Sequence, residues 1–323
     1  MLTDVMTHYG LARDLRQAGY FETEHHTQIV QEMRAAILTG QLIAVTGVVG
    51  SGKTVMLRRF QETLAREGKV IVSRSLSVEK SRATLQTLIT ALFDDRSNEK
   101  EVKIPPPGEE RERELQQLIR RKRKPIVLFV DEAHDLAVKT LVELKRLMEV
   151  AADVAGVLSI VLIGHPKLHN ALRRSTLEEI GSRTAVLPFE GLAGQQAGDI
   201  RGLLGTCAAE GTMLDSLITD AAIALVAERR LTPLQIEHHL ILAFEEGFRV
   251  GERPVTVEVI ENILAHDLND LEVRLTRHGY TVRALAEQFS AKPAEIRQLF
   301  RGELNAARFQ ELSERMRSAG LPI

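Results

Sequence analysis

The sequence is poor in cysteine and in aromatic residues. Among its 323 residues it has a single cysteine, Cys207, no tryptophan, and 4% aromatic residues. One cysteine excludes a disulfide within the chain and a zinc site built from several cysteines, which suits a reducing compartment. For Cys207 we expect the ordinary role of an inert small side chain.

Long hydrophobic runs and an excess of charge are also lacking. No segment approaches the roughly 18 consecutive apolar residues that a membrane span requires, and the N-terminus lacks the apolar run of a secretory signal. We therefore expect a cytoplasmic protein with no membrane partner. The 42 Lys and Arg nearly balance the 44 Asp and Glu, for a formal charge of −2. Nucleic acid would therefore have to be bound by a local basic patch.

What is present is the composition of a folded protein, with 44% hydrophobic and 27% charged residues, and a length that suggests about two domains. Up to about residue 190, short apolar runs alternate with helical patterns, which predicts a doubly wound parallel α/β layer. The expected strands are 42–45, 69–73, 126–130 and 157–163. The expected helices are 23–40, 54–66, 81–93 and 141–150. A charged, proline-broken loop is expected at 94–108.

Beyond Gly191 helical patterns dominate, and we expect helices at 195–210, 216–229, 233–247 and 256–266. Near residue 281 two short helices follow, 282–289 and 293–301, with Thr281 as the N-cap of the first and Pro293 opening the second. The predicted organisation is an N-terminal extension at 1–22, an α/β nucleotide-binding subdomain at 23–190, a helical lid at 191–268, and a C-terminal segment resembling a helix-turn-helix at 269–323.

The strongest motif follows the first expected strand and has the pattern G-x-x-x-x-G-K-T. Its glycines let backbone N–H groups turn around phosphate oxygens, and the following helix directs its N-terminus at the same anion. Lys53 is expected to neutralise the β- and γ-phosphates of ATP, and the Thr54 hydroxyl to bind Mg²⁺. The predicted ATP-binding residues are Gly47, Val48, Val49, Gly50, Ser51, Gly52, Lys53, Thr54 and Val55.

An acidic pair follows the most apolar strand, 126–130. Asp131 is expected to complete the Mg²⁺ site, and Glu132 to polarise the water that attacks the γ-phosphate. Such a pair can also cap the next helix, but its combination with the phosphate loop favours catalysis.

A third polar group is expected at the tip of the neighbouring strand, where His165 could contact the γ-phosphate or the water; a plain loop histidine is the alternative. Arg173, Arg174 and Arg183 are candidates for an arginine finger that enters a neighbouring subunit's site, and Arg183 is preferred. A solvated surface arginine is the alternative for that position.

Two histidine pairs invite a metal interpretation, but no further ligands accompany them at suitable spacing. For His25 and His26 we expect a surface pair or one flanking the adenine. For His238 and His239 we expect packing or a position on the lid surface.

The C-terminal segment has a modest basic excess, nine Lys and Arg against five Glu over residues 273–323, a net charge of +4. Its helix-turn-helix pattern leaves Lys292, Arg297, Gln298 and Arg301 on the outer face, for contact with DNA or with a protein partner. The basic run at 120–124 is either a solvated helix end or a second contact to a phosphate backbone.

Three segments in this order, Gly47–Thr54, Leu128–Leu136 and Ile163–Leu168, resemble the AAA+ ATPases typified by ExeA and by the transposition regulators TnsC, TniB, MuB and IstB. The resemblance spans about residues 20–265. It implies ATP and Mg²⁺ binding at subunit interfaces and assembly into rings or helical filaments. For the transposition branch it also implies sequence-tolerant binding along double-stranded DNA, with a transposase and a target-selector protein as partners.

Two positions depart from the family pattern. His165 stands where relatives often have Asn, Thr or Gln, and Leu234 stands where a G-x-P-R pattern would supply a second arginine. We therefore expect slow hydrolysis, or a nucleotide that acts mainly as a switch for assembly.

Three functions fit this sequence. The preferred one is a transposition regulator that oligomerises on duplex DNA with ATP. The second is an ExeA-like ATPase of secretion or envelope assembly, for which a membrane segment and a peptidoglycan-binding extension would be expected. The third is an initiator or transcription regulator with a sequence-specific helix-turn-helix.

Overall fold

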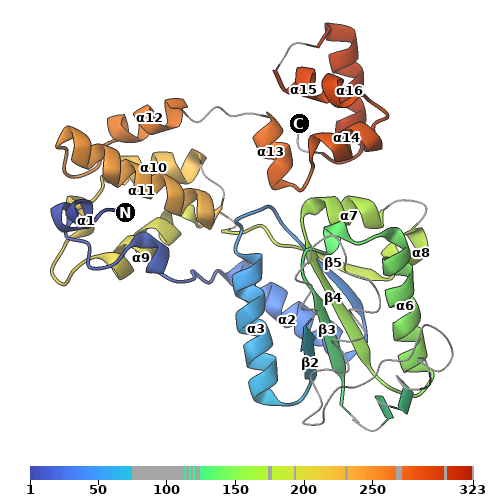
Figure 1. The fold of residues 1–323 in the computed structure, drawn as a ribbon. Helices are drawn as coiled ribbons and strands as arrows, with labels where there is room; N and C mark the ends of the chain where they lie inside the picture. The colour runs from blue at the N-terminus through green and yellow to red at the C-terminus, as the bar shows by residue number, and fades with distance from the viewer. Residues whose placement is uncertain are drawn as a thin grey trace. The chain divides into compact units, whose positions relative to one another are not determined.

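The structure is a computed structural model, and it forms two compact units (Figure 1). The helical unit comprises Met1–Thr27, Val48–Gly52 and Glu190–Arg274, and the sheet unit comprises Gln28–Gly47, Lys53–Phe189 and Leu275–Ile323. The described residues are 1–74, 113, 116–117, 119–120, 124–173, 177–192, 194–229, 232–266, 271–301 and 304–321. The helix expected at 81–93, the loop at 94–108 and most of the basic run at 120–124 lie outside them.

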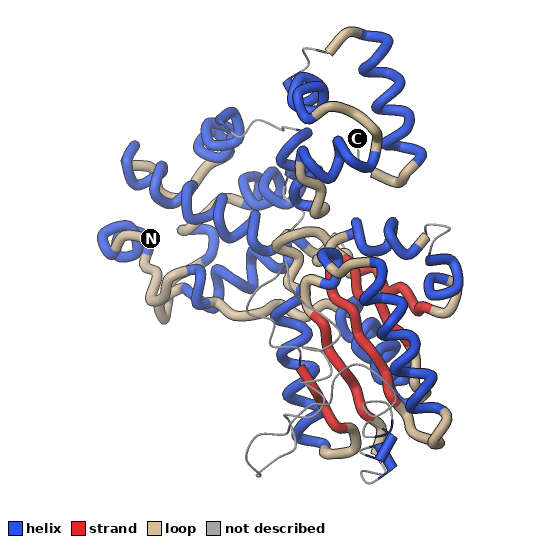
Figure 2. Tube along the Cα trace, turned by 45° about the vertical axis from the view of Figure 1, so that its right-hand side comes forward, coloured by secondary structure: helices blue, strands red, loops and turns tan. Residues whose placement is uncertain are grey.

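A sheet of five parallel strands forms the centre of the sheet unit, in the order β2-β3-β4-β1-β5 (Figure 2). The strands are β1 (Leu42–Thr46), β2 (Ile71–Arg74), β3 (Ile126–Val130), β4 (Leu158–Gly164) and β5 (Thr184–Pro188). Every residue of β1, β3 and β4 is buried. Their largely apolar sequences are explained by helices on both faces, as parallel sheets require.

The alternation of side chains along β3 shows how the two faces are covered. Leu128 and Val130 belong to the same core cluster as Leu144 of α6, whereas Phe129 packs edge-on against Phe60 of α3 with ring centroids 6.3 Å apart. The helices α3 and α6 therefore lie on opposite faces of the sheet (Figure 1). The helices of this layer are α2 (Glu24–Leu38), α3 (Lys53–Glu67), α6 (Val138–Ala152), α7 (Pro166–Leu172) and α8 (Glu178–Gly181).

The predicted α/β layer is confirmed. The expected strands 42–45, 69–73, 126–130 and 157–163 correspond to β1 to β4, within two residues at each end. The fifth strand, β5, is absent from the expectations because it lies at the sheet edge and its residues are only half-buried or exposed. Its short apolar stretch therefore lacks the signature of a covered strand.

The helical unit has its own apolar core, to which the N-terminal residues contribute. Val5 and Tyr9 of α1 (Thr3–Tyr9) are almost fully buried there. The Tyr9 hydroxyl donates to the carbonyl oxygen of Glu252 at 2.6 Å, and its ring packs edge-on against Phe244. Cys207 is fully buried in the same core. The other helices are α9 (Gln196–Cys207), α10 (Asp220–Arg229), α11 (Pro233–Val250) and α12 (Val257–His266).

Short 3₁₀ helices occur at Leu15–Gln17, Ala133–Asp135 and Leu214–Ser216. Among the helices that the structure describes, none combines the length and the apolar character needed to cross a bilayer. The predicted domain boundaries at residues 22, 190 and 268 stay predictions.

The C-terminal segment contains the predicted helix pair. Its helices are α13 (Leu271–Arg277), α14 (Val282–Gln288), α15 (Pro293–Arg301) and α16 (Ala306–Ser318). Thr281 caps α14 by accepting a hydrogen bond from the Ala284 N–H, as expected. Ser290, in the turn between α14 and α15, has a φ of 51°. The apolar side chains that these helices bury are those of Leu285, Ala286, Phe289, Ile296, Leu299, Leu312 and Met316.

A buried carboxylate in the helical unit predicts a pH-dependent stability. Asp199 in α9 is 4% exposed, and its Oδ2 has no hydrogen-bond partner among the described residues. Burial raises the pKa of Asp199 to about 6. Because the folded state binds the proton more tightly than the unfolded state, the carboxylate destabilises the fold above pH 6. This penalty is relieved as the pH falls from 6 to about 4.

We expect Asp199→Asn to raise the free energy of unfolding at pH 8 by on the order of 1–3 kcal/mol, and to give little gain at pH 4. Thermal unfolding of the variant and the wild type at both pH values measures this difference. Asp215→Asn, at an exposed aspartate of the same unit, is the control. An equal change in Tm for both variants at both pH values would contradict a raised pKa for Asp199.

Candidate nucleotide-binding site

The strand order brings three distant segments to one edge of the sheet. Because β4 lies between β1 and β3 and all three are parallel, their carboxyl ends face the same side. The phosphate loop follows β1, the acidic pair follows β3, and His165 follows β4. The Gly47 N–H also donates to the Gly164 carbonyl at 3.1 Å, which fixes the start of the phosphate loop beside the tip of β4.

The phosphate loop has the backbone that its sequence predicts. Gly50 and Gly52 have φ values of 79° and 95°, in the region that favours glycine. Lys53 begins α3, is 8% exposed, and donates from Nζ to the Gly47 carbonyl at 2.7 Å. Burial lowers the pKa of Lys53 to about 8, and the carboxylates of Glu132 and Asp131 oppose that effect. A desolvated ammonium of this kind is well suited to bind phosphate.

The acidic pair turns sharply at the end of β3. Glu132 has a φ of 53°, which is uncommon for a residue other than glycine, and its N–H donates to Asp131 Oδ1 at 2.9 Å. Glu132 Oε2 lies 3.5 Å from His134 Nδ1 and 3.9 Å from His165 Nε2. The carboxylate of Glu132 is thus held beside two imidazoles, next to the tip of β4.

His165 is therefore close to Glu132, in line with the sequence prediction. It occupies the N-cap position of α7, and its ring stacks on that of His134 with centroids 3.8 Å apart and 22° between the planes. The pKa of His165 is lowered to about 4, first by burial and then by His134 and Lys53. His165 is consequently a neutral imidazole near pH 7.

Sequence reasoning assigned no role to His134, although it lies within the D-E-A-H motif. Its backbone N lies close to Gly164, where an added Cβ would be 3.1 Å away, and its Nδ1 faces the His165 N–H at 3.4 Å. The D-E-A-H motif marked His134 as a residue near the site. Its stacking on His165 was not predictable, because His165 follows another strand and the two rings meet only through the strand order of the sheet.

These residues offer ligand atoms for two kinds of metal site. Thr54 and Asp131 offer a hydroxyl and a carboxylate, the hard oxygen ligands that Mg²⁺ prefers; both residues are exposed, so the donor set fits. Glu132, His134 and His165 also offer ligand atoms within 4.8 Å of one another. A metal ion lies near the plane of each imidazole that binds it, so these stacked rings cannot both hold one ion as they stand.

The arginine candidates are placed only in part. Arg173 caps the C-terminal end of α7, and Arg183 lies between α8 and β5; both are exposed. Arg174 lies outside the described residues. Exposure is compatible with a role in a neighbouring subunit, and the choice of Arg183 stays a prediction.

The first histidine pair requires a correction. His26 is 1% exposed, with Nδ1 bonded to the Tyr20 hydroxyl at 2.7 Å and Nε2 to the Gly191 carbonyl at 2.5 Å. The prediction of a surface pair is therefore wrong for His26. The ring can be buried because the Gly191 carbonyl, 165 residues along the chain, provides a hydrogen-bond partner for its Nε2. In the second pair, His239 Nδ1 bonds to the Gln235 carbonyl at 2.7 Å, consistent with packing.

Leu234 takes part in a backbone contact with the phosphate loop inside the helical unit. Its N–H donates to the Gly50 carbonyl at 3.3 Å, and its side chain is 54% exposed. Thr232 caps α11 just before it, in a capping box with Gln235. The position that would supply an arginine in the family pattern thus carries an exposed apolar side chain.

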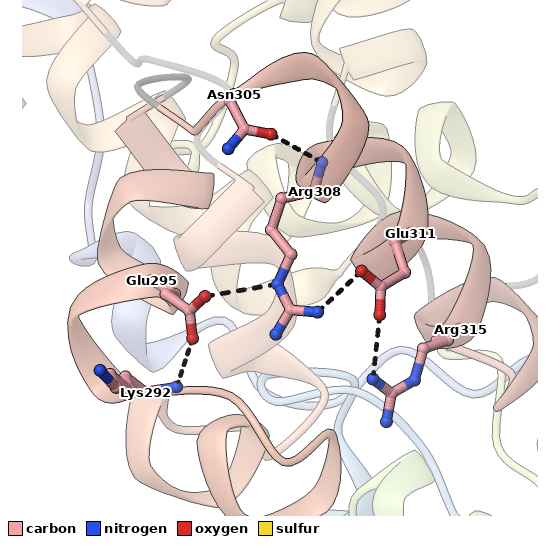
Figure 3. Close-up of polar contacts among 6 residues, drawn as sticks. All are labelled: Lys292, Glu295, Asn305, Arg308, Glu311 and Arg315. Carbon is pink, nitrogen blue, oxygen red and sulfur yellow. Dashed lines mark hydrogen bonds and ion pairs between the residues drawn. The ribbon is translucent and has the colours of Figure 1, made fainter.

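The outer face of the C-terminal segment is less basic than its composition suggests. Arg308 donates to Glu295 and Glu311, at 3.3 Å and 2.8 Å, and Arg315 pairs with Glu311 at 3.6 Å (Figure 3). The Lys292 N–H also donates to Glu295, and its side chain is exposed, as are those of Arg297 and Gln298. Arg301 ends α15, and its side chain is not described.

Comparison with known proteins agrees with this geometry. Residues 37–172 match the family model described as "AAA domain". General secretion pathway protein A of Aeromonas hydrophila is 27% identical over 171 residues, which cover 50% of this chain and 29% of that protein. The match thus spans less than a third of the relative's length.

Solved structures agree with the fold. Cdc6p from Pyrobaculum aerophilum matches with a TM-score of 0.53 at 18% identity, over 98% of this chain and 90% of that one. Drosophila ORC bound to DNA matches with a TM-score of 0.54 at 15% identity, over 94% and 82%. Residues 37–172 thus match an AAA domain, and the protein has a P-loop AAA+ fold.

We expect nucleotide binding to depend on Lys53. Lys53→Ala removes the buried ammonium that faces the loop, and should weaken ATP binding at least tenfold, since a charge-assisted contact contributes about 1.5–3 kcal/mol. Titration with a fluorescent ATP analogue measures the Kd. Lys139→Ala, at a lysine of α6 whose side chain is 87% exposed, should leave it unchanged. Equal affinity in both variants would show that the nucleotide binds elsewhere.

Proposed function

We propose that the protein is an ATPase that assembles on double-stranded DNA in its ATP-bound state. The observation that carries the enzymatic part is the meeting of the phosphate loop, the Asp131-Glu132 pair and His165 at one sheet edge. The finer proposal is a regulator of transposition that recruits a transposase and a target-selector protein. Its support is the succession of motifs, which resembles the AAA+ ATPases typified by ExeA and by the transposition regulators.

The roles of the residues follow from their positions. The loop N–H groups and Lys53 bind the β- and γ-phosphates, and Thr54 and Asp131 are the residues that would hold Mg²⁺. Mg²⁺, when bound, neutralises charge on the phosphate oxygens. The oxygen of the hydrolytic water attacks the γ-phosphorus while Glu132 accepts a proton from that water. The bond between the γ-phosphorus and the ADP oxygen breaks in the same step. Arg183 of a neighbouring subunit would stabilise the charge that develops there.

DNA binding is assigned to the C-terminal helices, and is expected to be weak for one protomer. The exposed side chains of Lys292, Arg297 and Gln298 are available for phosphate contacts. Because Arg308 and Arg315 are paired with glutamates, these two side chains contribute less to the release of counterions. Assembly with ATP would align many such faces along one duplex, which raises affinity by multivalency.

Two other functions have specific support. An ATPase of secretion or envelope assembly is favoured by the similarity to General secretion pathway protein A. An initiator or transcription regulator is favoured by the exposed polar side chains of α15, the second helix of the helix-turn-helix, where base-reading residues are found in such motifs.

Glu132→Gln tests the role of the proposed base. The amide cannot accept the proton, so we expect kcat for ATP hydrolysis to fall by about 10²-fold or more, with the Kd for ATP within about twofold of wild type. Steady-state phosphate release and ATP titration give the two values. Glu149→Gln, at an exposed glutamate of α6, is the control. An unchanged rate in Glu132→Gln would exclude Glu132 as the base.

Assembly is tested by negative-stain microscopy and by DNA binding with and without ATP. We expect rings or filaments on arbitrary duplexes only with ATP, an affinity that rises with duplex length, and weakening by salt. Persistent monomers under all conditions would contradict the proposal. A footprint confined to one sequence would favour the initiator instead, and ATPase activity without DNA binding would favour the secretion-type ATPase.

A further inference from the structure

The turn between α13 and α14 lies directly against His165, within the sheet unit. A Cβ added to Gly279 would be 2.4 Å from His165 Nδ1 and 2.8 Å from its Cβ, and Gly279 has a φ of 87°. Both constraints require glycine at this position. A segment more than a hundred residues along the chain therefore covers one edge of the His165 ring.

The next residue joins the same turn to the helix that His165 caps. The side-chain amide of Asn170, in α7, donates from Nδ2 to the Tyr280 hydroxyl at 2.6 Å, and Tyr280 is 1% exposed. At the other end of the segment, a Cβ added to Gly320 would be 3.2 Å from Asn170 Oδ1. The C-terminal helices thus contact both His165 and the helix that begins after it.

This contact determines which nitrogen of His165 carries the proton. Nδ1 is buried and has no hydrogen-bond partner among the described residues. A proton on Nδ1 would be a buried, unsatisfied donor, which is rarer and less favourable than an unused lone pair. Nε2 instead faces the Glu132 carboxylate at 3.9 Å, where an N–H is favoured. The ring is thus a neutral imidazole with its proton on Nε2.

We propose that Gly279 and Tyr280 are positioning residues of the hydrolytic site, which hold His165 as a neutral donor whose Nε2–H faces the group on which Glu132 acts. The inference rests on the proposed ATPase function, and it makes the C-terminal helices part of the active site.

The chain provides a matched pair of glycines for the test. Gly279 and Gly211 have nearly the same φ, 87° and 82°, but nothing lies within 4 Å of a Cβ at Gly211. Alanine at either position carries the same backbone strain, and only Gly279→Ala displaces His165. We expect Gly279→Ala to lower kcat about tenfold or more, with the Kd for ATP within about twofold, and Gly211→Ala to leave both within about twofold.

A double-mutant cycle separates this role from a structural one. In a His165→Ala background, Gly279→Ala should have no further effect on kcat, because the ring that it displaces is gone. Tyr280→Phe, which removes only the hydroxyl that Asn170 contacts, should lower kcat by less than Gly279→Ala while the protein stays folded. Equal kcat in Gly279→Ala and Gly211→Ala, or a loss that persists without His165, would overturn the proposal.

Nitrogen-15 NMR of the histidine rings tests the same inference without turnover. Wild type should show His165 as the Nε2–H tautomer at pH 7, and Tyr280→Phe should shift that signal. A proton on Nδ1 in the wild type would overturn the proposal. Because this measurement needs no hydrolysis, it remains decisive even if the wild type has no ATPase activity, a result that would count against the proposed function alone. The NMR measurement also tests the proposal if Gly279→Ala does not fold, because it uses only the wild type and Tyr280→Phe.

Discussion

The placement of β4 between β1 and β3 is the constraint on which the site depends. Parallel pairing aligns Thr46 of β1 with Gly164 of β4, and Val130 of β3 with Leu162 of β4. This register sets the heights at which the phosphate loop, Glu132 and His165 leave the sheet. A slip of one residue would turn each strand's buried side chains to the opposite face, so the same apolar packing that stabilises the sheet also fixes the reacting groups.

Local patterns were sufficient for much of the fold and for part of the site. The strands β1, β3 and β4 are buried throughout and mostly apolar, and β3 has the bounds that were expected. The phosphate loop and the acidic pair were found because each is a run of adjacent residues at a strand end. Contacts between distant segments were not found, because neither periodicity nor spacing encodes them. The stacking of His134 on His165, the burial of His26 under Gly191 and the packing of Gly279 on His165 are of this kind.

The charge of the C-terminal segment shows a second limit of composition. Its net excess is basic, yet Arg308 lies between two glutamates and shares one of them with Arg315 (Figure 3). Exposed pairs of this kind stabilise a fold by only about 0–1 kcal/mol each. Their larger effect is on recognition, since a guanidinium engaged by a carboxylate presents a weaker field to a phosphate. The helix that carries Arg297 is left as the more exposed source of positive charge.

The bond between the Tyr9 hydroxyl and the Glu252 carbonyl joins residues separated by 243 positions. A ribosome adds about 5–20 residues per second, so roughly 10–50 s separate the synthesis of these two partners. The first helix leaves the ribosome long before its core exists, and during that interval Val5 and Tyr9 are apolar side chains without their packing partners. Closure of the helical unit is therefore a late event in biosynthesis, and a nascent chain halted before residue 252 would expose its N-terminus to chaperones and proteases.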